Sequence, residues 1–423
     1  MKDVLPGEIA TWQLLEATAR ELLGSYGYEE LRVPIVEHTD LFKRAIGEYT
    51  DVVEKEMYSF IDQGRDERGV SLTLRPEATA GIVRAIISNG MLRGARHKLW
   101  CVGPMFRHER PQQGRYRQFH QIDVEAIGFA GPDVDVELIA LTARLWQRLG
   151  VERVSLQINS LGTPESRKLY RDRLIGYFTL HQQHLDADSQ RRLGGNPLRI
   201  LDSKNPEMQS IIAAAPLLTD HLDAPSREHF DSVCVCLRAL GIAYTVNPRL
   251  VRGLDYYSRT VFEWITDALG SQDAVCSGGR YDGLISQLGG EATPAVGFAL
   301  GVERVVALIA QTGRIASPGK AGVYVVAQGA EAELAALQIA ELLRGALPER
   351  RIELNLGGGN FKAQFRRADR SGAAFALVVG ADELARGVVQ LKPLRGAAAQ
   401  VEISRAELAS HVANALASFD ADA

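Results

Sequence analysis

Charged and polar side chains stand at alternate positions in two stretches of the chain, on either side of a turn-rich loop. These residues are Arg107, Glu109, Arg117, Gln121 and Glu125. If the loop is centred on Gln113, antiparallel pairing sets residue 107 opposite 119, 109 opposite 117 and 105 opposite 121. Side chains alternate between the two faces of a strand, and paired residues share a face. The spacing therefore predicts a hairpin with all five polar side chains on one face.

The predicted hairpin is also strongly basic. Between residues 93 and 117 there are seven Lys and Arg residues and one acidic residue, which gives a local net charge of +6. A guanidinium can pair with phosphate through two parallel hydrogen bonds, so Arg107 is suited to bind a phosphate group of a substrate. Taken alone, the hairpin could equally be a solvated strand pair with surface ion pairs worth about 0.2–1 kcal/mol each.

Four other segments combine glycine, arginine, carboxylate and tyrosine residues in patterns that suit a ligand site. They are residues 74–79 with Glu77 and Thr79, 250–257 with Arg252, Tyr256 and Tyr257, 277–283 with Tyr281, and 297–304 with Arg304. The first and the last are predicted strand-to-helix junctions, and the second precedes a predicted strand. The third is predicted to be a tight turn, whose glycines would let a ligand approach the backbone. Each segment also has a purely structural interpretation as a helix cap, a turn or a group of core aromatics.

Hydrophobic periodicity predicts the elements that would hold these residues. Strands are predicted at residues 31–36, 71–74, 98–103, 119–127, 155–158, 261–264 and 295–298, and helices at 10–25, 78–88 and 135–149. Pro34 places the first of these strands at an edge or an interface. Strands outnumber helices and the hairpin signals favour antiparallel pairing, so residues 1–312 are expected to form an α+β domain with an antiparallel sheet flanked by helices.

Two changes of pattern divide the rest of the chain. Residues from about 163 to 222 are helical in period and carry charges of both signs, with no predicted strand longer than 198–201, which indicates a helical insertion. Residues 313–320 contain two glycines and a proline and are predicted to be a linker. In residues 321–423 strands alternate with helices, which predicts an α/β domain with a mixed or parallel sheet.

This last domain carries a second basic segment. Residues 357–367 join a predicted strand to a helix and contain three glycines followed by Lys362, Arg366 and Arg367. Because Lys362 replaces the third glycine of a dinucleotide fingerprint, phosphate or RNA contact is favoured over a nucleotide cofactor. An ordinary helix start is the alternative.

The composition is that of an ordinary globular protein. The chain has 423 residues, 46% of them apolar, and a formal net charge of −4, a mean that conceals the two basic segments. The four cysteines form no C-x-x-C pair, so we expect a reducing cytoplasm, no disulfide framework and no zinc site. The start lacks an apolar signal region and no apolar run approaches about 18 residues, so neither export nor a membrane segment is expected.

Together and in this order, these segments resemble the class II aminoacyl-tRNA synthetases and, within that class, the histidine-specific family. Residues 28–37 with Pro34 resemble the first class motif, which forms the dimer interface, residues 106–125 the second and residues 297–304 the third. Residues 252–257 and 277–283 resemble the two signatures of the histidine enzymes. The resemblance runs nearly end to end. It implies a class II catalytic sheet, a helical insertion and a C-terminal anticodon-binding domain.

The resemblance implies a histidine–tRNA ligase reaction. L-Histidine would react with ATP to give histidyl-adenylate and pyrophosphate, and the histidine would then pass to the 3′ end of the histidine tRNA. Mg²⁺ would accompany ATP, bridging phosphate oxygens, with no metal site of the protein alone and no organic cofactor. The histidine carboxylate is already a nucleophile, so the first step needs alignment and charge stabilisation more than a general base. A cytoplasmic homodimer joined through the N-terminal domain is also implied.

Residue roles follow from the same resemblance. Arg107 would hold the α-phosphate, Glu109 the adenine amino group, and Arg304 would lie across the adenine near the γ-phosphate. Arg252, with Arg107, would be catalytic and would match the charge that grows on the α-phosphate. The implied histidine site consists of Glu77, Thr79 and Gln121 around the ammonium group and Glu125, Tyr256, Tyr257 and Tyr281 around the imidazole, together with Arg252. The implied tRNA contacts are Arg110, Gln112 and Arg115 at the acceptor end and Lys362, Arg366 and Arg367 in the last domain.

Other functions compete with this interpretation. A non-catalytic paralogue that regulates histidine biosynthesis would share the fold, but such proteins lack the anticodon-type domain and have degraded histidine signatures. A synthetase for threonine, proline or glycine is disfavoured by residues 252–257. A pure RNA-binding module would not need Arg107, Glu109 and Arg304 together.

Overall fold

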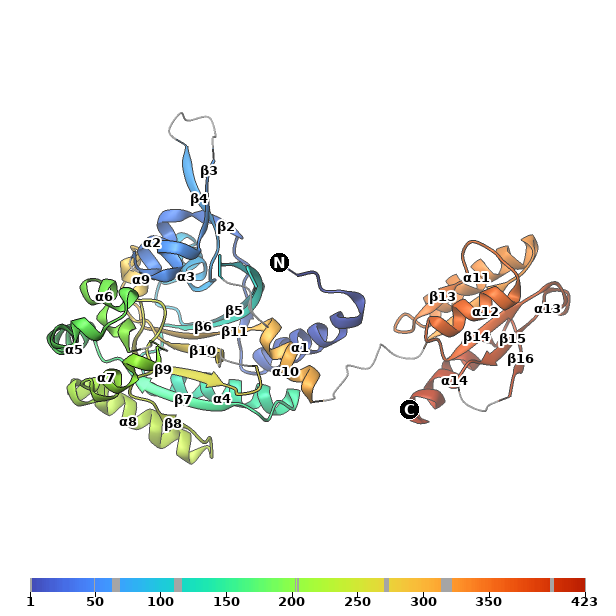
Figure 1. The fold of residues 1–423 in the computed structure, drawn as a ribbon. Coiled ribbons are helices and arrows are strands. Elements are labelled where there is room, and N and C mark those ends of the chain that lie inside the picture. The colour runs from blue at the N-terminus through green and yellow to red at the C-terminus, as the bar shows by residue number, and fades with distance from the viewer. Residues whose placement is uncertain are drawn as a thin grey trace. The chain divides into compact units, whose positions relative to one another are not determined.

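The chain folds into two compact units, Met1–Ala316 and Ser317–Ala423 (Figure 1). The computed structural model describes residues 2–48, 50–62, 69–109, 116–201, 203, 205–269, 274–312, 322–395 and 399–422. The predicted linker, residues 313–320, lies outside these ranges. No helix within them is long and apolar enough to cross a membrane.

The first unit is organised around an eight-stranded sheet with the order β1-β5-β6-β11-β10-β9-β7-β8. The outermost pairs, β1 with β5 and β7 with β8, are parallel, and all other neighbours are antiparallel. The strands are β1 (Glu29–Glu30), β5 (His97–Phe106), β6 (Gln118–Ile127), β7 (Ser155–Ser160), β8 (Thr245–Val246), β9 (Ser258–Ile265), β10 (Ala274–Arg280) and β11 (Ala295–Gly301). The expected antiparallel sheet is thus confirmed, with parallel edges.

Two hydrophobic clusters cover the two faces of this sheet. The helices of the first cluster are α1 (Pro6–Ser25), α4 (Pro132–Leu149), α8 (Ala224–Ala239) and α10 (Val302–Gln311). The helices beside the other face are α2 (Thr39–Ile46), α3 (Thr79–Ser88), α9 (Leu284–Gln287), α5 (Pro164–Leu180), α6 (Ala187–Gly194) and α7 (Gln209–Ala214). The second cluster is interrupted by the polar residues that form the site.

Strand β6 has one apolar face and one polar face. Ile122, Val124 and Ala126 are buried in the first cluster, under α1, α4 and α10. Gln121, Asp123 and Glu125 alternate with them and therefore point to the opposite face. One strand thus anchors the core and presents three polar side chains to the site.

The hairpin of β5 and β6 confirms the predicted shared face but not the predicted register. Met105 pairs with Phe119 and Gly103 with Gln121, so paired numbers sum to 224 rather than 226. The loop is centred one residue earlier than expected. Because this moves the pairing by two residues, an even number, Gln121 and Glu125 stay on the predicted face. Arg107, Glu109 and Arg117 lie just beyond the ends of the two strands; the first two line the same cavity as Gln121 and Glu125, and Arg117 does not.

Three other expectations differ from the structure. Residues 277–280, predicted as part of a turn, lie within β10. Of the strand predicted at 31–36, only Val36 lies in a strand, the edge strand β2 (Val36–His38), because β1 ends at Glu30 before the predicted range. Residues 198–201, the possible strand of the insertion, form a 3-10 helix at Pro197–Ile200. Glycine-rich β10 resembles a turn in composition, although its glycines are required by close strand packing. A Cβ on Gly278 would collide with the carbonyl of Gly297 and with Phe298 and Phe262.

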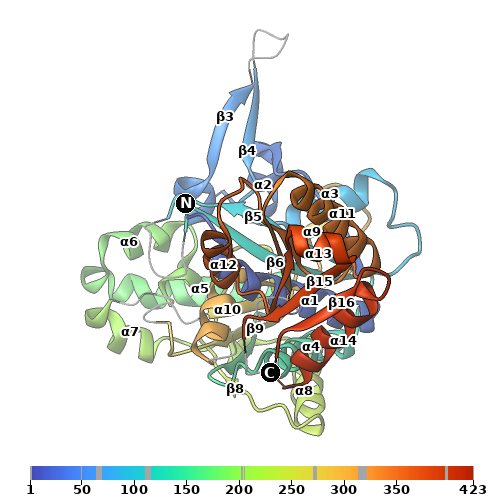
Figure 2. The ribbon, with the colours of Figure 1, turned by 90° about the vertical axis from the view of Figure 1, so that its right-hand side faces the viewer.

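Two smaller parts complete the first unit. Strands β3 (Tyr58–Asp62) and β4 (Val70–Leu74) project from its body, and β2 pairs with β4 at their base (Figures 1 and 2). The predicted helical insertion contains α5, α6 and α7. Its short turns are η2 (Gln182–His184), η3 (Pro197–Ile200), η4 (Pro206–Met208) and η5 (Leu218–His221), while η1 (Val52–Glu56) is a short π-helix outside the insertion.

The second unit has a five-stranded sheet in the order β13-β12-β14-β15-β16. The strands are β12 (Val323–Ala327), β13 (Ile352–Leu354), β14 (Phe375–Val379), β15 (Val388–Pro393) and β16 (Val401–Ser404). The helices are α11 (Ala330–Ala346), α12 (Phe361–Arg370), α13 (Ala381–Arg386) and α14 (Leu408–Asp422). Strand β12 is parallel to β13 and β14, whereas β15 is antiparallel to β14 and β16, which confirms the predicted mixed sheet.

Candidate active site

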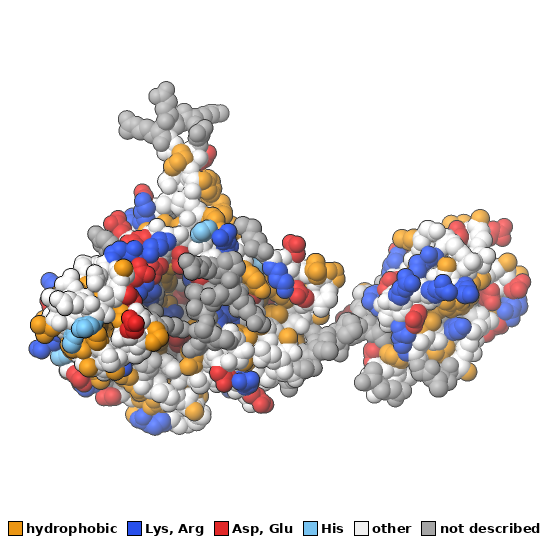
Figure 3. Space-filling model, in the orientation of Figure 1, with side chains coloured by type: hydrophobic (Ala, Val, Ile, Leu, Met, Phe, Trp, Pro, Cys, Tyr) orange, Lys and Arg blue, Asp and Glu red, His pale blue; other side chains and the backbone are white. Residues whose placement is uncertain are grey.

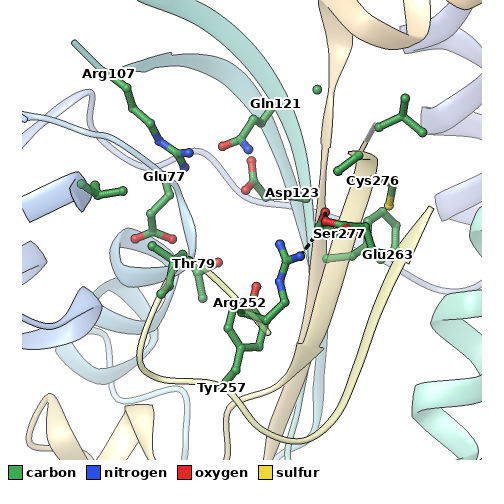
Figure 4. Close-up of a pocket in the computed structure, with 18 of the residues that line it drawn as sticks. Glu77, Thr79, Arg107, Gln121, Asp123, Arg252, Tyr257, Glu263, Cys276 and Ser277 are labelled. Carbon is green, nitrogen blue, oxygen red and sulfur yellow. Dashed lines mark hydrogen bonds and ion pairs between the residues drawn. The ribbon is translucent and has the colours of Figure 1, made fainter. Parts of the chain in front are cut away.

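A cavity of about 660 Å³ opens over the polar face of the large sheet. Ten of the residues predicted to bind substrates line it: Glu77, Thr79, Arg107, Glu109, Gln121, Glu125, Arg252, Tyr256, Tyr257 and Arg304. Figure 4 shows the side chains of Glu77, Arg107, Gln121 and Arg252 directed toward a common space. Segments that are far apart in the sequence therefore meet in one site.

The strand register explains why there is room for a ligand above β6. Glu125 lies opposite Gly297 on β11, Asp123 opposite Ala299, and Gln121 opposite Gly301. These small partners leave space beside three polar side chains. At Gly297 a Cβ atom would collide with the carboxylate of Glu125, so a glycine is needed there for that carboxylate to keep its place.

The end of the cavity near Arg107 is cationic. Arg107 donates from Nε to the carbonyl oxygen of Pro76 over 2.8 Å, and its guanidinium lies 5.3 Å from the centre of the Phe119 ring. Its Nη1 is 4.0 Å from Oε1 of Glu109, while Arg304 reaches the cavity from the first turn of α10. Two guanidinium groups beside an aromatic ring suit a ligand that combines phosphates with a planar base.

Glu77 and Thr79 lie at the junction of β4 and α3, as predicted. Oε1 of Glu77 accepts a hydrogen bond from the backbone N–H of Ala80 over 3.0 Å, so the side chain also satisfies a donor of the first helical turn. The other carboxylate oxygen has no hydrogen-bond partner among the described residues, and the side chain is only 3% exposed. Burial raises the pKa of Glu77.

Glu125 is held by hydroxyl groups on both of its carboxylate oxygens. Thr79 donates to Oε1 over 2.6 Å, and the hydroxyl of Tyr281 donates to Oε2. Burial raises the pKa of Glu125 to about 8, against the effect of these two hydrogen bonds. Tyr281 is not among the residues that line the cavity, so the structure places it behind Glu125 rather than at the cavity surface.

Arg252 is fixed by a carboxylate that the sequence did not single out. Its Nη1 donates to Oε1 of Glu263 over 2.8 Å, and the hydroxyl of Ser277 donates to the same oxygen over 2.9 Å (Figure 4). Glu263 on β9 pairs directly with Ser277 on β10. Burial lowers the pKa of Arg252, but the charge and hydrogen bond of Glu263, together with the nearby Tyr257 and Tyr256, outweigh this effect, and the net shift is upward. The guanidinium also lies 5.6 Å from the centre of the Tyr257 ring.

Sequence reasoning also missed Asp123 and two arginines of the insertion. Asp123 lines the cavity and is 1% exposed; its position between Gln121 and Glu125 on the same face was a usable signal. Arg199 of the insertion lines the cavity and lies 3.5 Å from Asp51, and Arg167 donates to the backbone carbonyl of Tyr257 over 2.6 Å. No local pattern marks these long-range contacts.

The predicted tRNA contacts fall into two groups. Arg110, Gln112 and Arg115 lie outside the described residues. On α12 of the second unit, Lys362 and Arg366 are exposed, and Figure 3 shows Lys and Arg side chains gathered on a face of this unit. Arg367 is half-buried and donates to the Asn355 side chain over 2.9 Å and to the carbonyl of Gly358 over 2.5 Å. These hydrogen bonds of Arg367 stabilise the loop before α12.

No group of three or more His, Cys, Asp or Glu side chains within the described ranges is arranged to hold a metal ion. The polar side chains described above are guanidinium, carboxylate, amide and hydroxyl groups. These can align a substrate and stabilise negative charge without a nucleophile from the protein.

Comparisons with known proteins agree with this geometry. Residues 58–312 match the family described as the tRNA synthetase class II core domain (G, H, P, S and T), and residues 321–415 match an anticodon binding domain. Apo histidyl-tRNA synthetase of S. aureus is 34% identical, with a TM-score of 0.81 and 97% of each chain covered.

Two further solved structures share the fold at lower identity. The histidyl-tRNA synthetase of Nostoc is 21% identical over 98% of each chain, with a TM-score of 0.67. A Bacillus halodurans protein described as an ATP phosphoribosyltransferase regulatory subunit/histidyl-tRNA synthetase is also 21% identical, with a TM-score of 0.63, and the match covers 90% of this chain and 96% of that one. The match of residues 58–312 to the class II core domain and the 34% identity to the S. aureus protein show that the chain belongs to the class II aminoacyl-tRNA synthetases.

Proposed function

We propose that the protein is a histidine–tRNA ligase. It would activate L-histidine with ATP to histidyl-adenylate and pyrophosphate and then transfer histidine to the 3′ end of the histidine tRNA. One observation carries this proposal: a single cavity joins the arginine-rich end with Arg107 and Arg304 to a polar floor where Thr79 and Tyr281 hold Glu125. The arginine-rich end suits a nucleotide. The polar region around Glu125 suits an amino-acid side chain with two polar atoms.

The polar floor supports histidine as the amino acid. An imidazole ring has two nitrogens, of which one donates and one accepts a hydrogen bond when the ring is neutral. Glu125 and Tyr257 line the cavity and supply a carboxyl and a hydroxyl group for these two atoms. A site that pairs buried polar groups with a substrate can reject an analogue lacking them by about 10⁴–10⁵-fold.

The arginines support the chemistry of the first step. The histidine carboxylate attacks the α-phosphorus of ATP, its oxygen forms the new bond to phosphorus, and pyrophosphate leaves. Arg107 and Arg252 are placed to match the negative charge that grows on the phosphate oxygens, and Glu263 keeps the Arg252 guanidinium in position. Mg²⁺ bound to the phosphates would neutralise part of the charge of ATP.

The second unit supports tRNA as the acceptor. Lys362 and Arg366 are exposed cations on α12, within the region that matches an anticodon binding domain. We also propose that the protein works in the cytoplasm as a homodimer joined through its N-terminal domain, as the resemblance of residues 28–37 to the first class motif suggests.

ATP–pyrophosphate exchange, measured with each amino acid in turn, tests the proposal. Exchange of label between pyrophosphate and ATP requires reversible adenylate formation, so we expect it with histidine alone. Exchange with threonine, proline or glycine instead would reassign the amino acid, and absence of exchange with all of them would reject the ligase.

A regulatory paralogue is the second candidate, because the similar Bacillus halodurans protein is described by both names. Such a protein would bind histidine without forming the adenylate. Histidine binding without exchange would therefore favour this candidate. The ion pair between Arg252 and Glu263 supports the ligase instead. The second unit does not separate the two candidates, because the match to the Bacillus halodurans protein covers 90% of this chain.

A further inference from the structure

The loop that carries Arg252 and Tyr257 is not held by strand pairing. Residues 251–257 lie directly before β9 and, among the described residues, pair with no strand. Arg252, Tyr256 and Tyr257 nevertheless all line the cavity, and the Arg252 guanidinium lies 5.6 Å from the centre of the Tyr257 ring (Figure 4). The backbone groups of such a loop need partners outside a sheet to stay in one place.

The helical insertion supplies such partners. Arg167 on α5 donates from Nη1 to the carbonyl oxygen of Tyr257 over 2.6 Å and to that of Asp255 over 3.4 Å. Asn196, also in the insertion, donates from Nδ2 to the Asp255 carboxylate over 2.6 Å. Two side chains of the insertion thus hold this loop, one through its backbone and one through a side chain.

Arg167 itself extends from a well-anchored helix end. Thr163 and Ser166 form a capping box at the first turn of α5, directly before Arg167. Asp223, which follows the insertion, accepts hydrogen bonds from the hydroxyl groups of Ser166 over 2.7 Å and Thr163 over 3.1 Å. One carboxylate therefore joins the start and the end of the insertion next to Arg167.

Arg252 and Tyr257 are held by different partners. Glu263 and Ser277 form hydrogen bonds that fix the Arg252 guanidinium from β9 and β10, whereas Arg167 holds the backbone of Tyr257. Removal of the Arg167 side chain should therefore disturb Tyr257 much more than the guanidinium of Arg252.

We propose that Arg167 is a positioning residue of the amino-acid site and sets the place of Tyr257 through its carbonyl group. The inference rests on the proposed histidine–tRNA ligase function, in which Tyr257 contacts the imidazole, and gives the insertion a part in binding the amino acid. A charged donor forms a stronger hydrogen bond with a carbonyl oxygen than a neutral donor does. This strength matters because a binding group has to be held within about 0.5 Å of its productive position.

Arg167→Ala tests this role by two measurements. In calorimetry the variant should bind L-histidine about 10-fold more weakly than the parent protein, because the hydrogen bond from a charged group is lost. In ATP–pyrophosphate exchange the KM for histidine should rise about 10-fold, while kcat and the KM for ATP change by less than about 3-fold. A merely structural role would lower the Tm and the active fraction, and hence kcat, without changing the histidine affinity.

Three further variants complete the experiment. Arg167→Lys keeps the charge and a donor and should restore histidine affinity to within about 3-fold of the parent. Arg167→Gln is uncharged and shorter and should repeat the loss, which keeps the test valid if the alanine variant unfolds. Arg171→Ala is the matched control, because Arg171 lies one turn further along α5 and donates to the carbonyl of Gly195, within the insertion, over 2.8 Å. Its histidine affinity should equal that of the parent.

A Tyr257→Phe background shows whether Arg167 acts through Tyr257. The substitution removes the hydroxyl group that would contact the imidazole, so Arg167→Ala should weaken histidine binding in this background by less than about 3-fold. An equal loss in the two backgrounds would show that Arg167 does not act through Tyr257.

The outcomes separate this inference from the proposed function. If the parent protein binds histidine but the alanine and glutamine variants bind it equally well, or the loss is the same in the Tyr257→Phe background, the inference is overturned. If the parent protein binds no histidine in calorimetry, the proposed function fails and the inference fails with it. A selective loss of histidine affinity that lysine restores supports the inference.

Discussion

Arg252 and Glu263 form an ion pair at the centre of the site, with 2.8 Å between Nη1 and Oε1. Ser277 donates to the same carboxylate oxygen from the neighbouring strand, so the pair is anchored to the sheet. A guanidinium that is held in place before the reaction begins does not have to be reoriented as charge develops on the phosphate. Glu263 is therefore a positioning residue for Arg252.

Replacing Glu263 with glutamine should slow adenylate formation with little effect on histidine binding. The amide keeps the size of the side chain but forms a weaker, neutral hydrogen bond, so we expect the rate of ATP–pyrophosphate exchange to fall about 10-fold. The KM for histidine should change by less than about 3-fold, because in the proposed reaction Glu263 acts on the phosphate end.

A double-mutant cycle shows whether Glu263 acts through Arg252. In an Arg252→Ala background, Glu263→Gln should cause no further loss, because the group that it positions is absent. Additive losses in the cycle would contradict the positioning role. Ser277→Ala is a milder change to the same carboxylate. It should lower the rate of ATP–pyrophosphate exchange by a smaller factor than Glu263→Gln does.

Glu125→Ala should abolish specific histidine binding. The substitution removes a buried carboxylate and leaves the hydroxyl groups of Thr79 and Tyr281 without their acceptor. We expect histidine affinity to fall by at least about 100-fold, while ATP affinity changes little. Calorimetric titration with each ligand checks this, and an unchanged affinity for histidine would remove Glu125 from the pocket.

The pH dependence of stability should report the burial of Asp123. Burial, reinforced by the charge of Glu77, raises the pKa of Asp123 to about 8. Between its usual pKa of about 4 and this value, the folded protein holds a proton on Asp123 that the unfolded chain releases. The extra proton on Asp123 stabilises the folded protein. Its contribution to the free energy of unfolding is fully present below about pH 4 and is lost as the pH rises from there through about 8, by at most about 1.4 kcal/mol per pH unit.

Asp123→Asn cannot ionise and should lack this contribution. In urea denaturation without ligands, the stability of the variant relative to the parent should increase from about pH 6 to about pH 9. Parallel pH profiles for the two proteins would show that Asp123 is not buried in the way the structure describes.

On α12, two adjacent arginines should behave differently. Arg366→Ala removes an exposed cation, so it should weaken tRNA binding and reduce its salt dependence without altering thermal stability. Arg367→Ala removes the hydrogen bonds to Asn355 and Gly358 and should destabilise the second unit by about 1–2 kcal/mol. Filter binding at several salt concentrations and thermal unfolding separate the two effects, and the reverse pattern would exchange their roles.

Much of the site was predictable because strand alternation is a local property. Arg107, Gln121 and Glu125 were placed on one face from their spacing, and the two-residue error in register did not move them. Asp123 obeys the same alternation and could have been included. Glu77, Thr79 and Arg304 were found because strand-to-helix junctions leave a local signal of capping and apolar period.

The remaining features depend on contacts between distant segments. The glycines of β10 were interpreted as a turn because composition does not reveal that Phe262 and β11 approach them closely. The pairing of Arg252 with Glu263 needs the register of β9 and β10, and the contact of Arg167 with the Tyr257 carbonyl needs the packing of the insertion. Such interactions arise only after the chain has folded.

Transfer of labelled histidine to tRNA tests the central claim most directly. The parent protein, given ATP, Mg²⁺, labelled histidine and histidine tRNA, should place label on the 3′ end of the tRNA. The Arg252→Ala variant should bind histidine with nearly the parent affinity yet charge the tRNA at least about 100-fold more slowly. A parent protein that binds histidine but leaves the tRNA unlabelled would contradict the account and identify a histidine-binding protein that is not a ligase.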